Sequence, residues 1–137
     1  MITLENEKLI EAIERFHERK NDATFEKFVK QVFLAKFIVP VEDLSQPVED
    51  GVLTKDTTFS MKMLTNETKK SYFMAFTDWE QFERWSKTHK DVLVLTYGDL
   101  MAMLNENNNN GDIVGAVINP FGGNMIVTPE LLKYAKI

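Results

Sequence analysis

The sequence contains no cysteine, and its only histidines are His17 and His89, which lie far apart in the chain. Without a thiol, the chain can form no disulfide, no iron–sulfur cluster and no cysteine-based zinc site, and it has no thiolate nucleophile. Two distant histidines also argue against a histidine-based metal centre. We therefore predict no metal site and no cofactor, with only an all-carboxylate Mg²⁺ or Ca²⁺ site left open.

Long apolar runs and dense basic segments are missing as well. A membrane-spanning helix needs a run of about 18 apolar residues, and no such run occurs. The first residues lack a basic region followed by an apolar block, so we predict no signal peptide and a cytoplasmic location. The net charge of −5 repels phosphate backbones, and we expect no nucleic-acid binding.

A catalytic set is not apparent in the sequence. No serine lies in a G-x-S-x-G setting, and the two histidines lie among charged residues, which favours solvated side chains over catalytic bases. We therefore expect a protein that is not an enzyme, and we retain an uncharacterised hydrolase or transferase as one alternative. The serines concerned are Ser45, Ser60, Ser71 and Ser86.

The 137 residues, of which 44% are hydrophobic, suffice for one domain over residues 1–137. Helical periodicity and capping residues predict four α-helices, and a fifth helix is predicted after Thr128 because Pro129 takes the favoured first position. The predicted helices cover 4–19, a segment capped by Asp22 or Thr24, a segment capped by Asp78 with Gln81 as its capping-box partner, a segment capped by Thr96, and the segment after Thr128.

Apolar and β-branched runs predict the strands. The run at 91–95 has the continuous apolar character of a central strand, whereas Pro40 places the run at 37–41 near an edge or a strand end. The other strands are expected at 58–64, 71–76, 113–118 and 125–127. Helices and strands alternate only in part, so we predict an α/β (α+β) fold. Its mixed β-sheet has about five to six strands, with helices packed on it.

The segment NPFGGN, residues 119–124, separates the last two predicted strands. Gly122 and Gly123 can adopt the positive φ that a tight hairpin needs. The spacing of a phosphate-binding loop is absent, because neither G-x-G-x-x-G nor G-x-x-x-x-G-K is present. Phe121 is expected at the tip of the turn, where an exposed aromatic ring can anchor a partner.

Two other segments have both a structural and a functional interpretation. Trp79, Phe82 and Trp85 form an aromatic stripe at helical spacing, which favours burial against the sheet over an exposed partner groove. The acidic segment 42–51 favours a solvated loop over an acidic partner site.

The ordered segments FTDWEQFERW (76–85) and AVINPFGGNMIVTPELL (116–132), with FIVPV upstream, resemble the N-terminal domain of the SseB family over about residues 20–135. The resemblance implies a bacterial cytoplasmic protein with a compact α/β domain. It implies no serine chemistry and assigns no catalytic residue.

Our leading hypothesis is a non-enzymatic binding or regulatory module that contacts an unknown protein partner, with a homo-oligomer left open. It places an exposed patch at Phe121 beside the acidic loop 42–51. The alternative is a small-metabolite, amino-acid-like sensor, in which backbone groups of the glycine pair bind a carboxylate and Asp78 binds an ammonium. The sensor site would lie where NPFGGN approaches the strand-to-helix corner at Thr77-Asp78-Trp79. Side chains filling that corner would rule the sensor out. The ligand or partner contacts are Asp78, Trp79, Asn119, Phe121, Gly122, Gly123 and Asn124.

Overall fold

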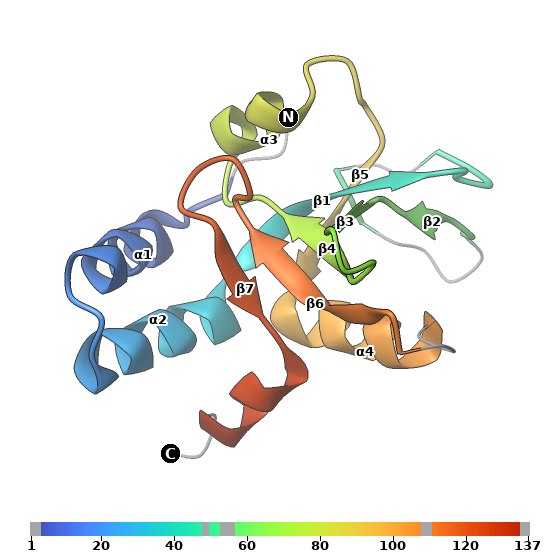
Figure 1. The fold of residues 1–137 in the computed structure, drawn as a ribbon. Helices are drawn as coiled ribbons and strands as arrows, with labels where there is room; N and C mark the ends of the chain where they lie inside the picture. The colour runs from blue at the N-terminus through green and yellow to red at the C-terminus, as the bar shows by residue number, and fades with distance from the viewer. Residues whose placement is uncertain (1–3, 48–49, 53–56, 108–110, 135–137) are drawn as a thin grey trace.

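The computed structural model describes residues 4–47, 50–52, 57–107 and 111–134. Figure 1 shows two helices at the start of the chain, a strand-rich middle, and the last two strands running together beside the helices. In chain order the elements are α1 (Glu7–Glu18), α2 (Asp22–Leu34), β1 (Lys36–Glu42), β2 (Ser60–Met61), β3 (Met63–Thr65), β4 (Ser71–Ala75), α3 (Trp79–Trp85), β5 (Val92–Thr96), α4 (Tyr97–Asn107), β6 (Ile113–Ile118), β7 (Met125–Val127) and the 3-10 helix η1 (Pro129–Tyr134).

The seven strands of the described segments form two sheets, with the orders β2-β1-β5 and β3-β4-β6-β7. Only β4 and β6 pair in parallel. Ile38 and Phe76 exchange two backbone hydrogen bonds of 2.9 Å, which join β1 to the end of β4 and connect the sheets. The predicted α+β fold with a mixed sheet is confirmed. The strand predicted at 58–64 is interrupted at Lys62, so its two halves pair with different neighbours.

Two strand positions differ from the sequence prediction. β1 is central and not peripheral, since it pairs with β5 on one side and with β2 on the other. The carbonyl of Pro40 accepts from Lys62 N–H at 3.2 Å, so the position that lacks an N–H faces β2 and not β5. Pro40 is tolerated there because it lies between the Ile38–Phe76 bridge and the pairing of Val41 with Met61, where the ladder is interrupted. Among the described strands, β5, which was predicted to be central, pairs with β1 alone, although Val94 N–H also donates to the Gly51 carbonyl at 2.8 Å.

Successive side chains point to opposite sides of a strand, and the two joined sheets have an apolar face on each side. One face packs against α1, α2, α4 and η1 in the larger core, which contains Phe28, Phe37, Phe73 and Leu100. The other face packs against α3 in a smaller core around Phe82. The aromatic stripe therefore faces the sheet as predicted: Phe82 is buried and packs edge-to-face with Phe76, while Trp79 and Trp85 are half-buried.

The cap of α2 and the type of the last helix are the two points at which the helices differ from expectation. α2 is capped by Asn21, not by Asp22 or Thr24; Asn21 Oδ1 accepts from Thr24 N–H at 2.9 Å, and Thr24 Oγ1 accepts from Asn21 N–H at 3.2 Å. Thr24 is thus the partner in a capping box. The last helix is a 3-10 helix and not an α-helix.

Candidate functional site

The turn at 119–124 joins β6 to β7, and its two asparagines shape it. Asn119 and Asn124 have φ values of 49° and 51°, whereas Gly122 and Gly123 do not have positive φ. The expectation that the glycines supply the left-handed conformation is therefore wrong. Asparagine tolerates this region because its short side chain can bond locally. The carbonyl of Asn119 closes the turn by accepting from Gly122 and Asn124 N–H groups, each at 2.9 Å.

The side chain of Asn119 fixes the base of the turn to the end of β4. Its Oδ1 accepts from Thr77 N–H at 3.0 Å, and its Nδ2 donates to Thr77 Oγ1 at 3.0 Å. Asn119 is 4% exposed and Thr77 is 0% exposed. Both polar ends of the amide are thus engaged inside the protein, where an unpaired group would be costly.

The neighbouring polar groups at this corner are also paired within the chain. Asn6 Nδ2 donates to the carbonyls of Thr77 and Lys36 at 2.8 and 2.9 Å. The two carboxylate oxygens of Asp78 accept from Gln81 N–H at 2.9 Å and from Thr77 Oγ1 at 3.0 Å. Asp78 is therefore the helix cap that was predicted. The side chains of Asn6, Thr77, Asp78 and Asn119 fill the corner where the sensor hypothesis placed a ligand.

The two glycines allow the turn to lie against two helices. A Cβ on Gly122 would lie 2.3 Å from Gln81 Oε1 of α3, and a Cβ on Gly123 would lie 2.6 Å from Ile13 Cγ2 of α1. The close approach leaves no room for a Cβ at Gly123, where Ile13 is buried in the core, whereas at Gly122 the obstacle is the end of a flexible side chain. The capping-box role predicted for the Gln81 side chain is not observed, since Oε1 is buried and has no hydrogen-bond partner.

Two charged or titratable side chains hold the tip of the turn from either side. Arg84 Nη1 of α3 donates to the carbonyl of Phe121 at 3.3 Å. His17 Nε2 of α1 lies 2.5 Å from the carbonyl of Gly123, a contact that requires the proton on Nε2. His17 was predicted to be a solvated side chain. It is exposed, but it also contacts the backbone of the turn. His89 also bonds to the backbone, with Nε2 at 2.8 Å from the carbonyl of Val41.

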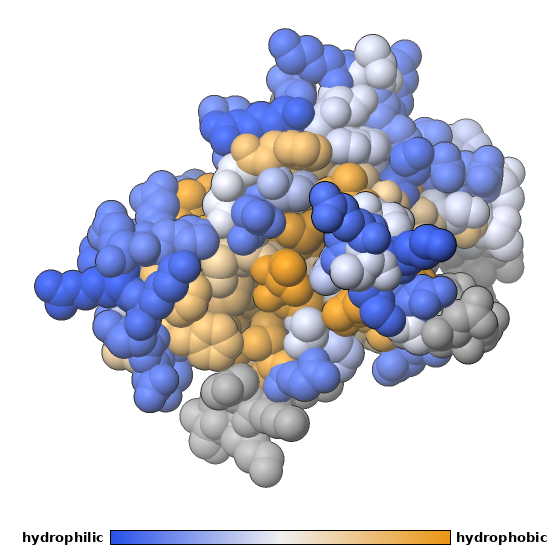
Figure 2. All heavy atoms as spheres, in the orientation of Figure 1, coloured by the Kyte–Doolittle hydropathy of each residue, from blue (hydrophilic) through white to orange (hydrophobic). Residues whose placement is uncertain are grey.

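Phe121 projects from this fixed turn with 51% of its surface exposed, and Ile126 on β7 is 54% exposed. Figure 2 shows apolar surface between the α1–α2 pair and the β3–β4 hairpin, framed by hydrophilic residues. Trp79 is half-buried against Phe82, with ring centroids 5.3 Å apart. The exposure of Phe121 agrees with the expectation that it lies at the tip.

The acidic loop does not adjoin Phe121, contrary to our expectation. The turn is tied to the Lys36 end of β1 through Asn6 and Thr77, whereas the loop follows Glu42 at the other end. A strand of seven residues spans roughly 20 Å, and Figure 1 shows the β6–β7 turn and the loop after β1 at opposite sides of the sheet. Residues 48–49 of the loop lie outside the described residues.

The feature of the turn that is available to contact a partner is the exposed ring of Phe121. Across the described residues, no three histidine, aspartate or glutamate side chains gather in a way that would hold a metal ion. Away from the turn, burial, assisted by the negative charge of Glu130, raises the pKa of Tyr97 to about 12.

The approach of the turn to Thr77 was predicted, and the hydrogen bonds between Asn119 and Thr77 confirm it. The other residues that support the turn were not predicted, because they come from α3 and from α1 and its cap, and their contacts depend on the three-dimensional arrangement. They are Asn6, Ile13, His17, Gln81 and Arg84. One local signal was available: Asn119 and Asn124 flank the turn symmetrically, and asparagine is the residue besides glycine that most readily takes positive φ.

The chain matches the family model of the SseB protein N-terminal domain over residues 9–133. This match confirms the resemblance seen in segments 76–85 and 116–132. No curated protein and no solved structure matches the chain. Within the described segments, no helix combines the length and apolar character that crossing a bilayer requires.

Proposed function

The chain belongs to the SseB family, and from this premise we propose that it is a non-enzymatic binding or regulatory module that acts through protein contacts. The observation that carries the proposal is the exposed ring of Phe121, which lies on a turn that is hydrogen-bonded to the rest of the fold. Aromatic side chains dominate the binding energy of many protein interfaces, especially where they insert into a partner's pocket.

Rigid presentation of Phe121 favours binding because it lowers the ordering cost of association. The turn is bonded to β4 through Asn119, to α3 through Arg84 and to α1 through His17. A loop already held in one conformation loses less entropy on binding than a free loop does. The apolar surface framed by hydrophilic residues in Figure 2 is of the kind that marks interaction sites.

The sensor hypothesis gains less support from the geometry. Its ammonium ligand was Asp78, whose two oxygens accept bonds from Gln81 and Thr77. Its carboxylate ligand was the backbone of the glycine pair, and Gly122 N–H donates to the carbonyl of Asn119. A ligand at this corner would have to replace bonds that the fold already makes.

The test is capture of partners from a lysate of the source cells with tagged protein, followed by mass spectrometry. Phe121→Ala should lose specific partners while the thermal midpoint stays within a degree or two, because an exposed ring contributes little to folding. Val52→Ala is the matched control, since Val52 is 62% exposed and follows the loop at the far end of β1. Equal capture by both variants would show that Phe121 is not the anchor.

Self-association needs a separate measurement, because the partner in this proposal can be a second copy of the chain. Sedimentation velocity over a range of concentrations measures it directly. If two copies associate through this turn, Phe121→Ala shifts the distribution towards the monomer and Val52→Ala leaves it unchanged.

A further inference from the structure

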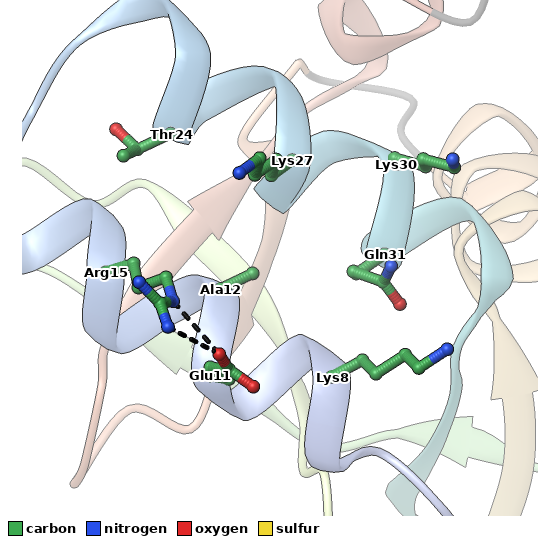
Figure 3. A pocket seen from close by; sticks show the side chains of 8 residues that line it. All are labelled: Lys8, Glu11, Ala12, Arg15, Thr24, Lys27, Lys30 and Gln31. Atoms are coloured by element: carbon green, nitrogen blue, oxygen red, sulfur yellow. Dashed lines mark hydrogen bonds and ion pairs between the residues drawn. The ribbon is translucent and has the colours of Figure 1, made fainter.

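A groove runs between α1 and α2 on a different side of α1 from the Phe121 turn. Its central part has a volume of about 440 Å³, with Ala12 lying between the two helices (Figure 3). Two further hollows continue it: one shares Lys8 and Gln31 with the central part, and the other shares Arg15 and Lys27. The three hollows therefore form one elongated groove along the helix pair.

Positive charge is concentrated in the central part of this groove, although the whole chain has a net charge of −5. The end hollows are more balanced, since they add Glu5, Glu7 and Glu18 against Arg19. The central part is lined by four cationic side chains, Lys8, Arg15, Lys27 and Lys30, against a single carboxylate, that of Glu11. Glu11 is bonded to Arg15 Nη2 at 2.9 Å on the α1 rim. The three lysines have no carboxylate within ion-pair distance among the described residues, so their charge is available to an anionic ligand.

An exposed apolar side chain stands at one end of the groove. Leu34 is the most exposed large hydrophobic residue of the described segments, at 70%. It lines the end hollow together with Lys8 and Gln31. The ligand that matches this surface is therefore anionic where it lies over the central part and apolar where it reaches Leu34.

We propose that the groove between α1 and α2 binds an extended acidic segment of a protein partner, with an apolar residue of that segment packed on Leu34. α1 has 12 residues and a length of about 18 Å, which an extended peptide spans with about five or six residues. The inference rests on the proposed protein-contact function and assigns that function a second surface and a class of partner.

The shape of the groove favours a peptide over a small anion. The cationic side chains on both rims are exposed to solvent, and Figure 3 shows them spread along two helices. Small-molecule sites enclose most of the ligand surface, whereas an open, elongated groove suits a chain that carries repeated charges. Spread charges on mobile side chains also favour fast, salt-sensitive association.

The test is fluorescence anisotropy of the full chain with a rhodamine-labelled peptide of five glutamates followed by leucine. Lys27→Glu/Lys30→Glu should weaken binding at least tenfold, and added salt should weaken it further. Lys70→Glu/Lys87→Glu is the matched control, since it changes the net charge equally at exposed lysines outside the groove and should change the affinity less than twofold. All four side chains are exposed, and thermal midpoints verify that both variants fold.

The apolar end has its own control. Leu34→Ser should weaken binding of the leucine-ended peptide about three- to fivefold and leave a glutamine-ended peptide unaffected. Phe121→Ala should leave both affinities unchanged, which separates this inference from the proposed role of Phe121.

The inference is overturned if the acidic peptide does not bind, if both double variants lose affinity equally, or if short-chain polyphosphate binds while the peptide does not. In each of these outcomes the proposed role of Phe121 still stands or falls on its own capture experiment.

Discussion

Asn119 and Thr77 exchange two hydrogen bonds of 3.0 Å across 42 positions of sequence, one to the Thr77 backbone and one to its hydroxyl. The pair lies just beyond the ends of two parallel strands, β4 and β6, and links the segments that follow them. Because both residues are buried, the pair fixes the start of the NPFGGN turn relative to the start of α3. The position of the exposed Phe121 ring follows from this arrangement.

Asn119→Ala should lower the free energy of unfolding by roughly 2–4 kcal/mol. The buried N–H of Thr77 loses its acceptor, which costs about 1–3 kcal/mol, and alanine at a φ of 49° adds about 1 kcal/mol of backbone strain. Urea unfolding followed by tryptophan fluorescence measures the change.

Asn124→Ala is the control for the backbone part of that effect. Asn124 has a φ of 51° but is exposed, so its replacement should cost only about 1 kcal/mol. If the two variants lose equal stability, the buried hydrogen bonds of Asn119 contribute nothing measurable.

Gly123→Ala should destabilise the fold more than Gly122→Ala does. The new Cβ at position 123 would lie 2.6 Å from Cγ2 of Ile13, which is buried in the core, and overpacking of this kind typically costs about 1–3 kcal/mol. At position 122 the obstacle is the end of the Gln81 side chain, which can rotate away. Its Oε1 has no bond to lose, so this variant should stay within about 1 kcal/mol of wild type. Thermal unfolding of both variants checks the order, and the reverse order would contradict the packing shown by the structure.

Local patterns in the sequence predicted most of the elements but not how the strands pair. The apolar runs at 37–41 and 91–95 became β1 and β5. Among the described strands, however, β1 is central and β5, which was expected to be central, lies at an edge. Pro40 favoured an edge or a strand end because a proline cannot donate to a neighbouring strand. It lies in a central strand because that neighbour changes from β4 to β2 at this position, which is a tertiary feature.

The location of the candidate site was predicted from the sequence, but the way in which its residues shape the turn was not. The sequence located the turn and the exposed Phe121, and it assigned conformational freedom to the glycines. In the structure the asparagines provide the positive φ and the glycines provide close contact with Ile13 and Gln81. The cationic groove was missed because Lys8 and Arg15 lie on one helix, and Lys27 and Lys30 on the next. Only the packing of α1 against α2 brings them together.

Tyr97→Phe should make the stability difference from wild type depend on pH above pH 10. Burial raises the pKa of Tyr97 from 10.0 to about 12, and its hydroxyl donates to the carbonyl of Thr128 at 2.5 Å. A raised folded-state pKa means that the native state holds the proton more tightly, so this stabilisation is complete below pH 10 and is lost as the pH rises towards 12. The loss is roughly 2–3 kcal/mol.

The phenylalanine variant has no such loss, although it starts about 1 kcal/mol less stable because it lacks the hydrogen bond. Urea unfolding of both proteins at several pH values between 8 and 11.5 should show the gap closing above pH 10 and then changing sign, so that the phenylalanine variant is the more stable protein at the highest pH. A constant gap over this range would mean that the hydroxyl titrates in the folded protein as it does in the unfolded chain.

Amino acids and other small zwitterionic metabolites should leave the thermal midpoint of the protein unchanged. The groups that would bind them are already bonded: Asp78 to Gln81 and Thr77, and the Asn119 amide to Thr77. A ligand at 100 times its Kd would stabilise the protein by about 2.7 kcal/mol, which is a rise of several degrees for a domain of this size. A saturable rise of that size with one amino acid, abolished by Asp78→Asn, would restore the sensor hypothesis. It would also show that the corner opens in solution.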